Sequence, residues 1–318
     1  MSDTQSIGLL KNKNILLTGG RGFIGRHLER HLKKLGATVI KLDRGISENT
    51  LAVDLNDYEQ MQSVIAQINT KSPIHFIFHL AGQKGSAACK LEPFKSLSYA
   101  FNGTINLLES CKTLDELNKI ILISSIGVYG SDEDGDAGSY HELHTPKTES
   151  IYSSTKVITE SLGIAYAKEF KVPALIVRLS NVYGPNQPQG ALIPDLISQM
   201  SDPSATISMG SSAPIRDFIH IEDAVSALTC LIATKNSEIG EIFNICSGEG
   251  TSVKEIVESL VEYTQFRGTI TVNPAKVRSN EKLTLVASNE KLRDITNWCP
   301  NKSLKEGLRE LCQAMKQK

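Results

Sequence analysis

The sequence predicts an α/β protein with a Rossmann-type, doubly wound parallel sheet and a smaller, discontinuous C-terminal substrate region. In its first half, short and nearly continuous apolar segments alternate with longer amphipathic ones. That alternation is typical of parallel strands covered by helices on both faces. The first apolar segment runs into a glycine-rich turn, which in this position is typical of a dinucleotide site. The 318 residues allow one large or two small domains.

Each expected element rests on its own pattern. β-Branched runs predict strands over 13–18, 38–43, 74–80, 119–124, 174–179 and 241–246. Apolar residues at helical spacing predict helices over 23–35, 57–69, 93–113, 151–170, 252–265 and 304–316. After residue 180, prolines interrupt the pattern. We therefore expect an NAD(P)-binding domain over 1–180, to which 217–247 returns, and a substrate-binding region formed by 181–216 and 248–318.

The composition excludes several classes of partner. Lys+Arg number 34 against 35 for Asp+Glu, giving a net charge of −1, so nothing favours a nucleic-acid or membrane-surface partner. No apolar run suits a signal peptide or a membrane span. The six cysteines are scattered without a Cys-x-x-Cys pair, which favours buried thiols over disulfides or a metal site. These observations predict a cytoplasmic location.

The segment "TGGRGFIG" places glycines at positions 19, 22 and 25, where the first strand gives way to a helix. One glycine lets the chain turn sharply, another lets backbone N–H groups approach a pyrophosphate, and a third lets the helix pack against the sheet. The helix N-terminus then faces the phosphates. A glycine-rich turn without a ligand is the structural alternative.

Asp43 ends the second strand, eighteen residues after Gly25. An acid near this distance accepts hydrogen bonds from the adenosine ribose and repels a 2′-phosphate. NAD is therefore favoured over NADP. Arg21 and Arg44 keep NADP open, because either could neutralise a 2′-phosphate. Asp43 could also be a turn residue at the end of a strand.

Tyr152 and Lys156 stand four residues apart in "IYSSTK", so they share one face of the predicted helix. A tyrosine beside an ammonium can act as an acid–base, because the positive charge favours the tyrosinate form. By itself the pair is no more than chance would place in a chain of this composition. Its significance depends on the rest of the sequence.

Together with the glycine turn and Asp43, the chain resembles the extended short-chain dehydrogenase/reductase family. More narrowly, it is similar to the NAD-dependent epimerase/dehydratase group that acts on nucleotide-diphosphate sugars. The likeness runs from about residue 13 to 312 and includes the segments "TGGRGFIG", "VDLND", "HLAGQK", "NGTINLLES", "ISSIGVYG", "YSSTK", "RLSNVYGP", "IRDFIHIEDAV" and "FNICSGEGTSV". Nine matches in order are far more specific than any one of them.

The resemblance implies catalytic roles for Ser125, Tyr152 and Lys156. Tyr152 takes the proton of a sugar hydroxyl while hydride passes to the nicotinamide, Ser125 hydrogen-bonds that hydroxyl, and Lys156 also holds the nicotinamide ribose. By position, the implied cofactor contacts are Gly19, Gly22, Phe23, Ile24, Gly25, Asp43, Arg44, Asp54, Leu55, Leu80, Ala81, Gly82, Ser124, Tyr152, Lys156 and Leu179. The implied substrate contacts are Lys84, Ser125, Asn181, Arg216 and Arg278. The resemblance also implies a homodimer.

Three departures bear on the reaction. Ala100 stands where the family usually has asparagine, so that helix departs from the family pattern. Ile126 and Gly127 occupy the places of the acid–base pair found in members that eliminate water, which argues against 4,6-dehydration. The stretch from Asp43 to Asp54 is short, and in its length it resembles the same stretch of 4-keto sugar reductases.

We therefore expect a nucleotide-sugar C4 epimerase that oxidises its substrate to a 4-keto sugar with NAD and reduces it again. The first alternative is an NAD(P)H-dependent reductase of a 4-keto-6-deoxy sugar. The second is a non-catalytic protein that senses a dinucleotide, since a fold alone does not establish chemistry.

Overall fold

A computed structural model describes residues 8–45, 50–82, 85–130, 139–277 and 283–316. Its main body is a seven-stranded parallel sheet of order β10-β6-β5-β4-β1-β2-β3, which confirms the expected fold class. The strands are β1 (Asn14–Thr18), β2 (Thr38–Asp43), β3 (Thr50–Ala52), β4 (Phe76–His79), β5 (Lys119–Ser125), β6 (Ala174–Leu179) and β10 (Ile242–Ile245). The strand order reverses next to β1, which is where open α/β sheets bind their ligands.

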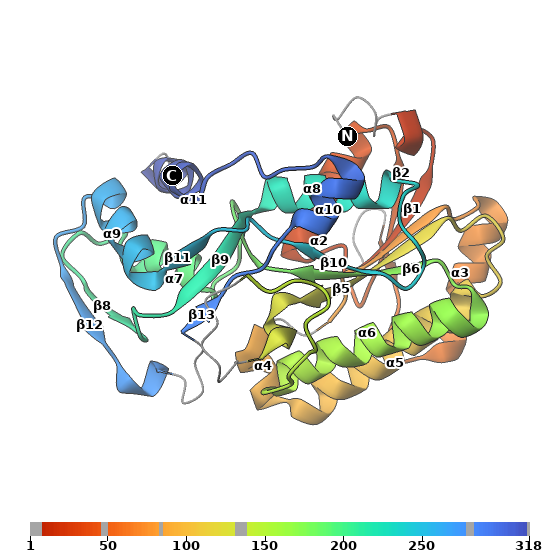
Figure 1. Cartoon of the computed structure of the whole chain (residues 1–318), viewed down its shortest axis with the longest axis horizontal. Helices are drawn as coiled ribbons and strands as arrows, with labels where there is room; N and C mark the ends of the chain where they lie inside the picture. Colours follow the sequence, from red (N-terminus) through yellow and green to blue (C-terminus); the bar gives the residue numbers. More distant parts are fainter. Residues whose placement is uncertain (1–7, 46–49, 83–84, 131–138, 278–282, 317–318) are drawn as a thin grey trace.

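Helices cover both faces of this sheet (Figure 1). On one face lie α2 (Phe23–Lys34), α8 (Ile221–Ala233) and α10 (Glu290–Thr296), and on the other α3 (Tyr58–Lys71), α5 (Pro93–Cys111) and α6 (Ile151–Phe170). Shorter pieces, α4 (Gly85–Leu91) and the 3₁₀ helix η1 (Ile126–Tyr129), follow β4 and β5. Because both faces are covered, β6 is buried along its whole length.

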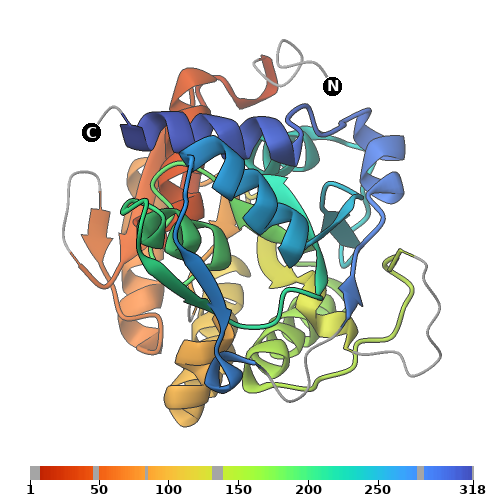
Figure 2. The same ribbon diagram turned by 90° about the vertical axis from the view of Figure 1, so that its left-hand side faces the viewer.

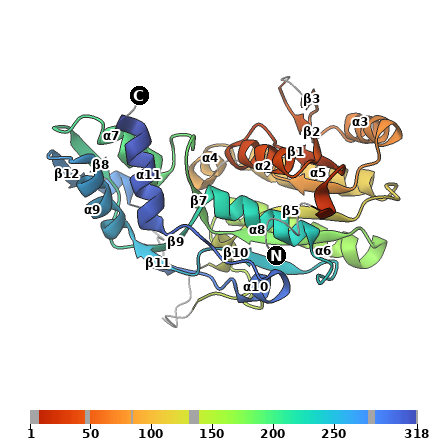
Figure 3. The same cartoon turned by 90° about the horizontal axis from the view of Figure 1, so that it is seen from above.

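The remaining elements form a second, smaller unit beside the carboxyl ends of these strands (Figures 1 and 3). Its strands are β7 (Asn181–Tyr183), β8 (Thr206–Met209), β9 (Ile215–His220), β11 (Gly250–Ser252), β12 (Thr269–Val272) and β13 (Thr284–Leu285). Its helices are α7 (Leu192–Gln199), α9 (Val253–Thr264), α11 (Leu304–Lys316) and the short 3₁₀ helix η2 (Pro274–Lys276). Figure 2 shows this unit face-on, with a hydrophobic core of its own between its strands and helices.

The chain crosses between the two units more than once. Within 217–247, α8 and β10 lie in the large unit, because β10 pairs with β6. β9 instead pairs with β7, β11 and β13 in the smaller sheet. α10 comes late in the chain but packs in the core of the large unit through Leu292. The division into a cofactor domain and a substrate region remains our proposal, with its exchange point at the start of α8.

The helix that carries Tyr152 is defined at both ends. Ser150 accepts a hydrogen bond from the Ser153 amide, and Ser153 reaches back to the Ser150 amide, so the two form a capping box. At the other end, Lys171 adopts a left-handed conformation with φ 58°, which commonly terminates a helix. Tyr152 therefore lies in the first turn of a helix whose start is fixed. Within the described ranges, no helix is long and apolar enough to cross a lipid bilayer.

Candidate active site

The glycine turn between β1 and α2 allows two close backbone approaches. A Cβ on Gly19, which has φ 68°, would lie 2.8 Å from the backbone of Ala81 at the end of β4. A Cβ on Gly25 would lie 2.7 Å from the Gly19 carbonyl oxygen. Gly22 precedes α2 without a side-chain cap, and the first turn of α2 holds no acidic residue. The backbone N–H groups of this helix end are therefore available to an anion, as a pyrophosphate requires.

Asp43 lies beside this turn, at the end of β2. Its carboxylate accepts hydrogen bonds from the backbone N–H of Arg44 at 2.8 Å and of Arg21 at 3.3 Å. A carboxylate has about four acceptor sites, so it can accept ribose hydroxyls as well. The guanidinium of Arg44 lies 5.2 Å from the centre of the Tyr99 ring. The expected NAD-selecting acid and an arginine that could oppose it thus lie at the same corner.

Ser125 and Tyr152 are brought together around Gly127. Ser125 ends β5 and caps η1, and its Oγ accepts a hydrogen bond from the Gly127 N–H at 3.1 Å. A Cβ on Gly127 would lie 3.3 Å from Ser125 Oγ and 3.8 Å from Tyr152 Cε1. A side chain at position 127 would therefore stand next to both hydroxyl-bearing residues. Glycine leaves this space open.

Lys156 follows Tyr152 by one helical turn and points toward the end of β5. Its Nζ donates a hydrogen bond to the carbonyl of Ile123 at 3.1 Å and lies 5.8 Å from the centre of the Tyr152 ring. A Cβ on Gly82 would lie 3.8 Å from the same Nζ. An ammonium has three donors, so Lys156 keeps donor capacity for a ligand.

A small chamber lies behind Lys156. Its walls are Ala81, Gly82, Ser96, Ala100, Thr104, Thr155, Lys156 and Thr159. Ala100, where the family usually has asparagine, is therefore a wall of the space next to Lys156. Beyond the chamber, His79 bonds Thr18 Oγ1 at 2.7 Å. Burial and the charge of Lys156 lower the pKa of His79 to about 3, so its ring is neutral beside the ammonium.

Ser124 buries its side chain against α6. It is 2% exposed, and its hydroxyl donates to the carboxylate of Glu160. Glu160 in turn pairs with Arg178. We did not expect these two residues at the site. The sequence does carry a signal for them, because an arginine inside an apolar strand and a glutamate on a packed helix need partners when buried.

Asn181 and Arg216 lie near each other because β7 pairs with β9, with Asn181 opposite Phe218. Asn181 donates its amide to the carbonyl of Asp217 at 2.9 Å. Arg216 donates to the carbonyls of Ile215 at 2.9 Å and Leu283 at 3.4 Å. The guanidinium is thus held against the backbone of β9 and of the residue that precedes β13.

Asp217 is a third residue that we did not expect at the site. It is fully buried and accepts hydrogen bonds from Ser247 N, Ser247 Oγ and Gly248 N, each at 2.9 Å. Burial raises the pKa of Asp217, and the three hydrogen bonds act in the opposite direction. These bonds fasten the loop after β10 to the strand that carries Arg216. No local pattern announces a contact between segments thirty residues apart.

The remaining expected cofactor contacts vary in exposure. Asp54 is exposed, whereas Leu55 is 7% exposed and belongs to the core beneath α3 and α5. Phe23, Ile24, Leu80 and Ala81 are partly buried around the ends of β1 and β4, and Leu179 is buried at the end of β6. Lys84 and Arg278 lie outside the described residues.

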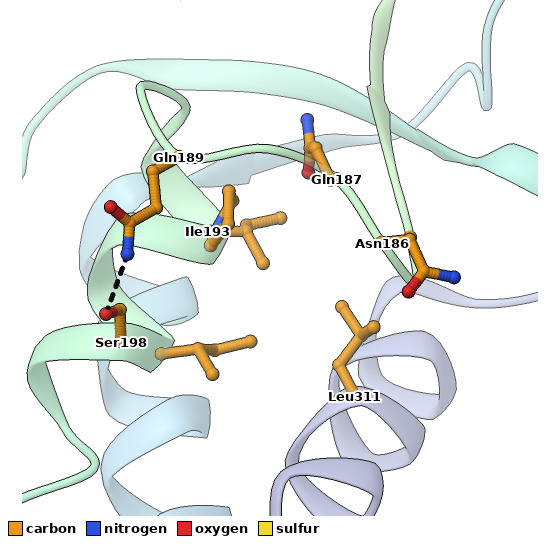
Figure 4. A pocket seen from close by; sticks show the side chains of 9 residues that line it. Asn186, Gln187, Gln189, Ile193, Ser198 and Leu311 are labelled. Atoms are coloured by element: carbon orange, nitrogen blue, oxygen red, sulfur yellow. Dashed lines mark hydrogen bonds between the residues drawn. The ribbon is translucent and has the colours of Figure 1, made fainter. Parts of the chain in front are cut away.

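A separate cavity of about 250 Å³ opens between α7, the loop 184–190 and Leu311 on α11 (Figure 4). Its rim carries the carboxamides of Asn186, Gln187 and Gln189, and Gln189 donates to Ser198 Oγ at 3.0 Å. Ile193 and Leu311 face its interior (Figure 4). None of Ser125, Tyr152 and Lys156 is among the residues that line this cavity.

Comparisons with known proteins find relatives over most of the chain. The family model for the NAD dependent epimerase/dehydratase family matches residues 15–246. The GDP-6-deoxy-D-mannose reductase of Pseudomonas aeruginosa is 26% identical over 304 residues, covering 94% of this chain and 96% of the reductase.

Two solved structures are similar over nearly their whole length. The UDP-glucose 4-epimerase of Thermotoga maritima, solved with UDP-glucose, has a TM-score of 0.86 at 27% identity and covers 96% of this chain and 99% of its own. The UDP-glucuronic acid 4-epimerase of Bacillus cereus, in complex with UDP-glucuronic acid and NAD, has a TM-score of 0.83 at 28% identity with the same coverage. These relatives act on nucleotide sugars but catalyse different reactions.

Proposed function

This chain belongs to the NAD-dependent epimerase/dehydratase family, and from that premise we propose that it is a nucleotide-diphosphate-sugar C4 epimerase. It would oxidise the C4 hydroxyl to a 4-keto sugar and reduce it again from the opposite face. The observation that carries the proposal is the grouping of Ser125, Tyr152 and Lys156 around Gly127 and Ile123. Because the family consists of enzymes and this grouping is intact, we set aside the non-catalytic sensor.

Each residue of this set would have a distinct task. Tyr152 accepts the proton of the C4 hydroxyl during oxidation and returns it during reduction. Ser125 donates a hydrogen bond to the reacting oxygen. Lys156, fastened to the Ile123 carbonyl, keeps a positive charge near the phenol and favours its ionised form.

The residues around the glycine turn fit a nicotinamide dinucleotide. Gly19, Gly22 and Gly25 have no side chain, so the backbone of the turn can pack closely and a pyrophosphate can approach it. The start of α2 has no side-chain cap, so its N–H groups can bind the pyrophosphate. Asp43 would bind the adenosine ribose, which favours NAD over NADP. When bound, the dinucleotide supplies the acceptor and the donor of hydride. The chain's own residues hold it, position the sugar and move the proton.

Gly127 also bears on the choice among family reactions. Elimination of water needs an acid and a base beside the reacting carbons. A carboxylate at position 127 would stand between Ser125 and Tyr152, but glycine is there, and Ile126 is buried in a small apolar cluster. Neither side chain can move a proton, which supports oxidation and reduction at C4 over 4,6-dehydration.

The nucleotide diphosphate would be held from the smaller unit. Arg216 suits a diphosphate because its planar fork can bind two oxygens at once, and the bonds to Ile215 and Leu283 orient it in advance. Asn181 would contact the sugar or the adjacent phosphate. By family position, Lys84 and Arg278 would complete this set.

A second candidate is an NAD(P)H-dependent reductase of a nucleotide 4-keto-6-deoxy sugar. It is supported by the similarity to GDP-6-deoxy-D-mannose reductase and by the short stretch between Asp43 and Asp54. The same catalytic residues would serve, since a reductase performs only the second half of the epimerase cycle.

A panel of UDP-, GDP- and dTDP-sugars tests the proposal. The protein is assayed with each sugar, first without added cofactor, then with NAD⁺, and then with NADH or NADPH. We expect a C4 epimer from one hydroxy sugar without net consumption of reduced cofactor. Stoichiometric consumption with a 4-keto-6-deoxy sugar, and no epimer from any hydroxy sugar, would assign the reductase instead. No turnover in any arm would refute both.

A further inference from the structure

A buried ion pair joins α6 to β6, one helical turn beyond Lys156. The side chains of Glu160 on α6 and Arg178 on β6 are 4% and 1% exposed. Arg178 binds the carboxylate with two parallel bonds, Nη2 to Oε2 at 2.7 Å and Nε to Oε1 at 3.0 Å. Such forked pairs fix both distance and orientation. A buried pair is weak evidence of stabilisation, so its value to the protein lies elsewhere.

The pair is joined to the strand that carries Ser125. Glu160 follows Lys156 by one helical turn, and its carboxylate also accepts the hydroxyl of Ser124. Lys156 donates to the carbonyl of Ile123. α6 is therefore fastened to two consecutive residues of β5, immediately before Ser125. These two bonds hold the helix that carries Tyr152 against the strand that carries Ser125.

The other side of the pair holds the turn that follows Ser125. The guanidinium of Arg178 lies 4.7 Å from the centre of the Tyr129 ring, at the end of η1. Tyr129 donates its hydroxyl to Asn244 Oδ1 on β10 at 2.7 Å. Burial raises the pKa of Tyr129 to about 12, so this donor keeps its proton near neutral pH. Arg178 and Asn244 therefore both hold Tyr129, the last residue of η1.

We propose that Glu160 and Arg178 are positioning residues that hold Tyr152 and Lys156 in register with Ser125, which rests on the proposed function. Because both side chains are buried, we expect neither to touch the sugar or the cofactor. They act through Ser124 on one side and Tyr129 on the other, so that the phenol and the serine hydroxyl face the same oxygen. A misplacement of about 1 Å in such a set can cost about 100-fold in rate.

The decisive variant removes both charges together. Replacing only Glu160 would leave an unpaired guanidinium in the core, which is strongly destabilising, whereas exchange of a whole buried pair for apolar residues is often tolerated. Glu160→Leu combined with Arg178→Met should therefore fold while losing both tethers. We expect kcat to fall at least tenfold with KM nearly unchanged, because only the alignment of the reacting groups is lost.

An isotope effect separates positioning from a merely structural role. With substrate deuterated at C4, the isotope effect on kcat should grow in the double variant, because hydride transfer slows relative to the other steps. A smaller folded fraction would lower kcat without changing that ratio. Tyr166→Phe is the matched control. It removes a hydrogen bond between the same helix and a different neighbour, Glu109 on α5, and it should leave the isotope effect unchanged.

Two further measurements keep the inference testable. If the double variant does not fold, Ser124→Ala removes only the bond between β5 and Glu160, and it should lower kcat and raise the isotope effect to a smaller extent. If the wild type turns over no nucleotide sugar, the proposed function fails. Hydrogen exchange then tests, without any assay of activity, whether the Glu160–Arg178 pair holds β5 and η1 in place. Amides of residues 123–129 should then exchange faster in the folded double variant than in Tyr166→Phe. If the double variant keeps the kcat and the isotope effect of the wild type, the proposal is overturned. If the wild type is inactive, equal amide exchange in the double variant and in Tyr166→Phe would overturn it.

Discussion

The ammonium of Lys156 donates a hydrogen bond to the carbonyl of Ile123 at 3.1 Å. Lys156 comes from α6, whereas Ile123 lies on β5, two residues before Ser125. The positive charge is thus fixed against β5, the strand that also carries the serine hydroxyl. Tyr152 lies one helical turn before Lys156 on α6, so it is fixed against the same strand. The geometry expected of a proton-transferring set therefore follows from one helix held against one strand.

Replacement of Tyr152 by phenylalanine should abolish most of the activity. The substitution keeps the ring and removes only the phenolic oxygen that we propose accepts the sugar proton. Positioned proton transfer typically contributes about 10²- to 10⁴-fold in rate, so we expect kcat to fall by that factor with cofactor affinity retained. Tyr166→Phe on the same helix provides the control. Near-wild-type turnover in Tyr152→Phe would contradict the assigned acid–base.

Asp43→Asn should reduce the preference for NAD over NADP. Asparagine keeps the shape of the side chain but removes the charge that repels a 2′-phosphate. Calorimetric titrations of both cofactors into the wild type and the variant measure the effect. We expect tighter binding of NAD by the wild type and a smaller gap in the variant. Tighter binding of NADP by the wild type would mean that Arg21 and Arg44 dominate this corner.

The protein should lose stability on acidification through His79. Its pKa is about 3 in the folded protein and about 6.5 in an unfolded chain. Between these values the unfolded chain binds a proton that the folded one does not, so the free energy of unfolding falls as pH decreases from about 6.5 toward 3. The slope is about 1.4 kcal/mol per pH unit.

Chemical denaturation at about pH 7.5 and about pH 5 measures this loss. From about pH 6.5 to pH 5, the wild type should lose about 2 kcal/mol more than His79→Asn, which cannot titrate. Burial, the largest influence on each, also lowers the pKa values of His27, His75 and His220, but these groups are common to both proteins and cancel. Equal losses in the two proteins would contradict a buried neutral His79.

Much of the fold could be predicted because its signals are local. β2 and β6 have the predicted bounds, and α6 spans the predicted 151–170, since continuous apolar runs and apolar residues at helical spacing are visible in the sequence. β9 was not predicted. Its strand carries Arg216, Asp217 and His220, and Asp217 is buried only because a loop thirty residues later supplies three donors.

The candidate site likewise contains residues that local motifs predict and residues that only the tertiary structure brings together. Ser125, Tyr152 and Lys156 belong to short motifs, and the structure places Ser125 and Tyr152 on either side of Gly127. Glu160 and Arg178 could not be paired from sequence alone, because their contact depends on how α6 lies across β6. A buried arginine shows that a partner exists, but only tertiary structure shows which residue it is.

Arg216→Ala should weaken binding of the nucleotide sugar without slowing the chemistry. A diphosphate contact is made equally in the ground state and the transition state, so its loss raises KM and leaves kcat nearly unchanged. Steady-state kinetics of the folded variant measure both constants, and Arg216→Lys should show an intermediate KM because lysine lacks the fork. Unchanged KM in Arg216→Ala would leave the residue a purely structural role through Ile215 and Leu283.

The fate of a deuterium at C4 separates the epimerase from the reductase. Both reactions need Ser125, Tyr152 and Lys156, so substitutions there cannot distinguish them. In an epimerase the hydride leaves C4 and returns to the same carbon, so the cofactor ends as it began and can stay bound. We expect a C4-deuterated hydroxy sugar, with no cofactor added, to give the C4 epimer with the label kept at C4. A reductase instead takes its hydride from added cofactor, so deuterium from labelled NAD(P)H would appear at C4 of a 4-keto-6-deoxy sugar. Label transfer from the cofactor, without an epimer from any hydroxy sugar, would replace our assignment with the reductase.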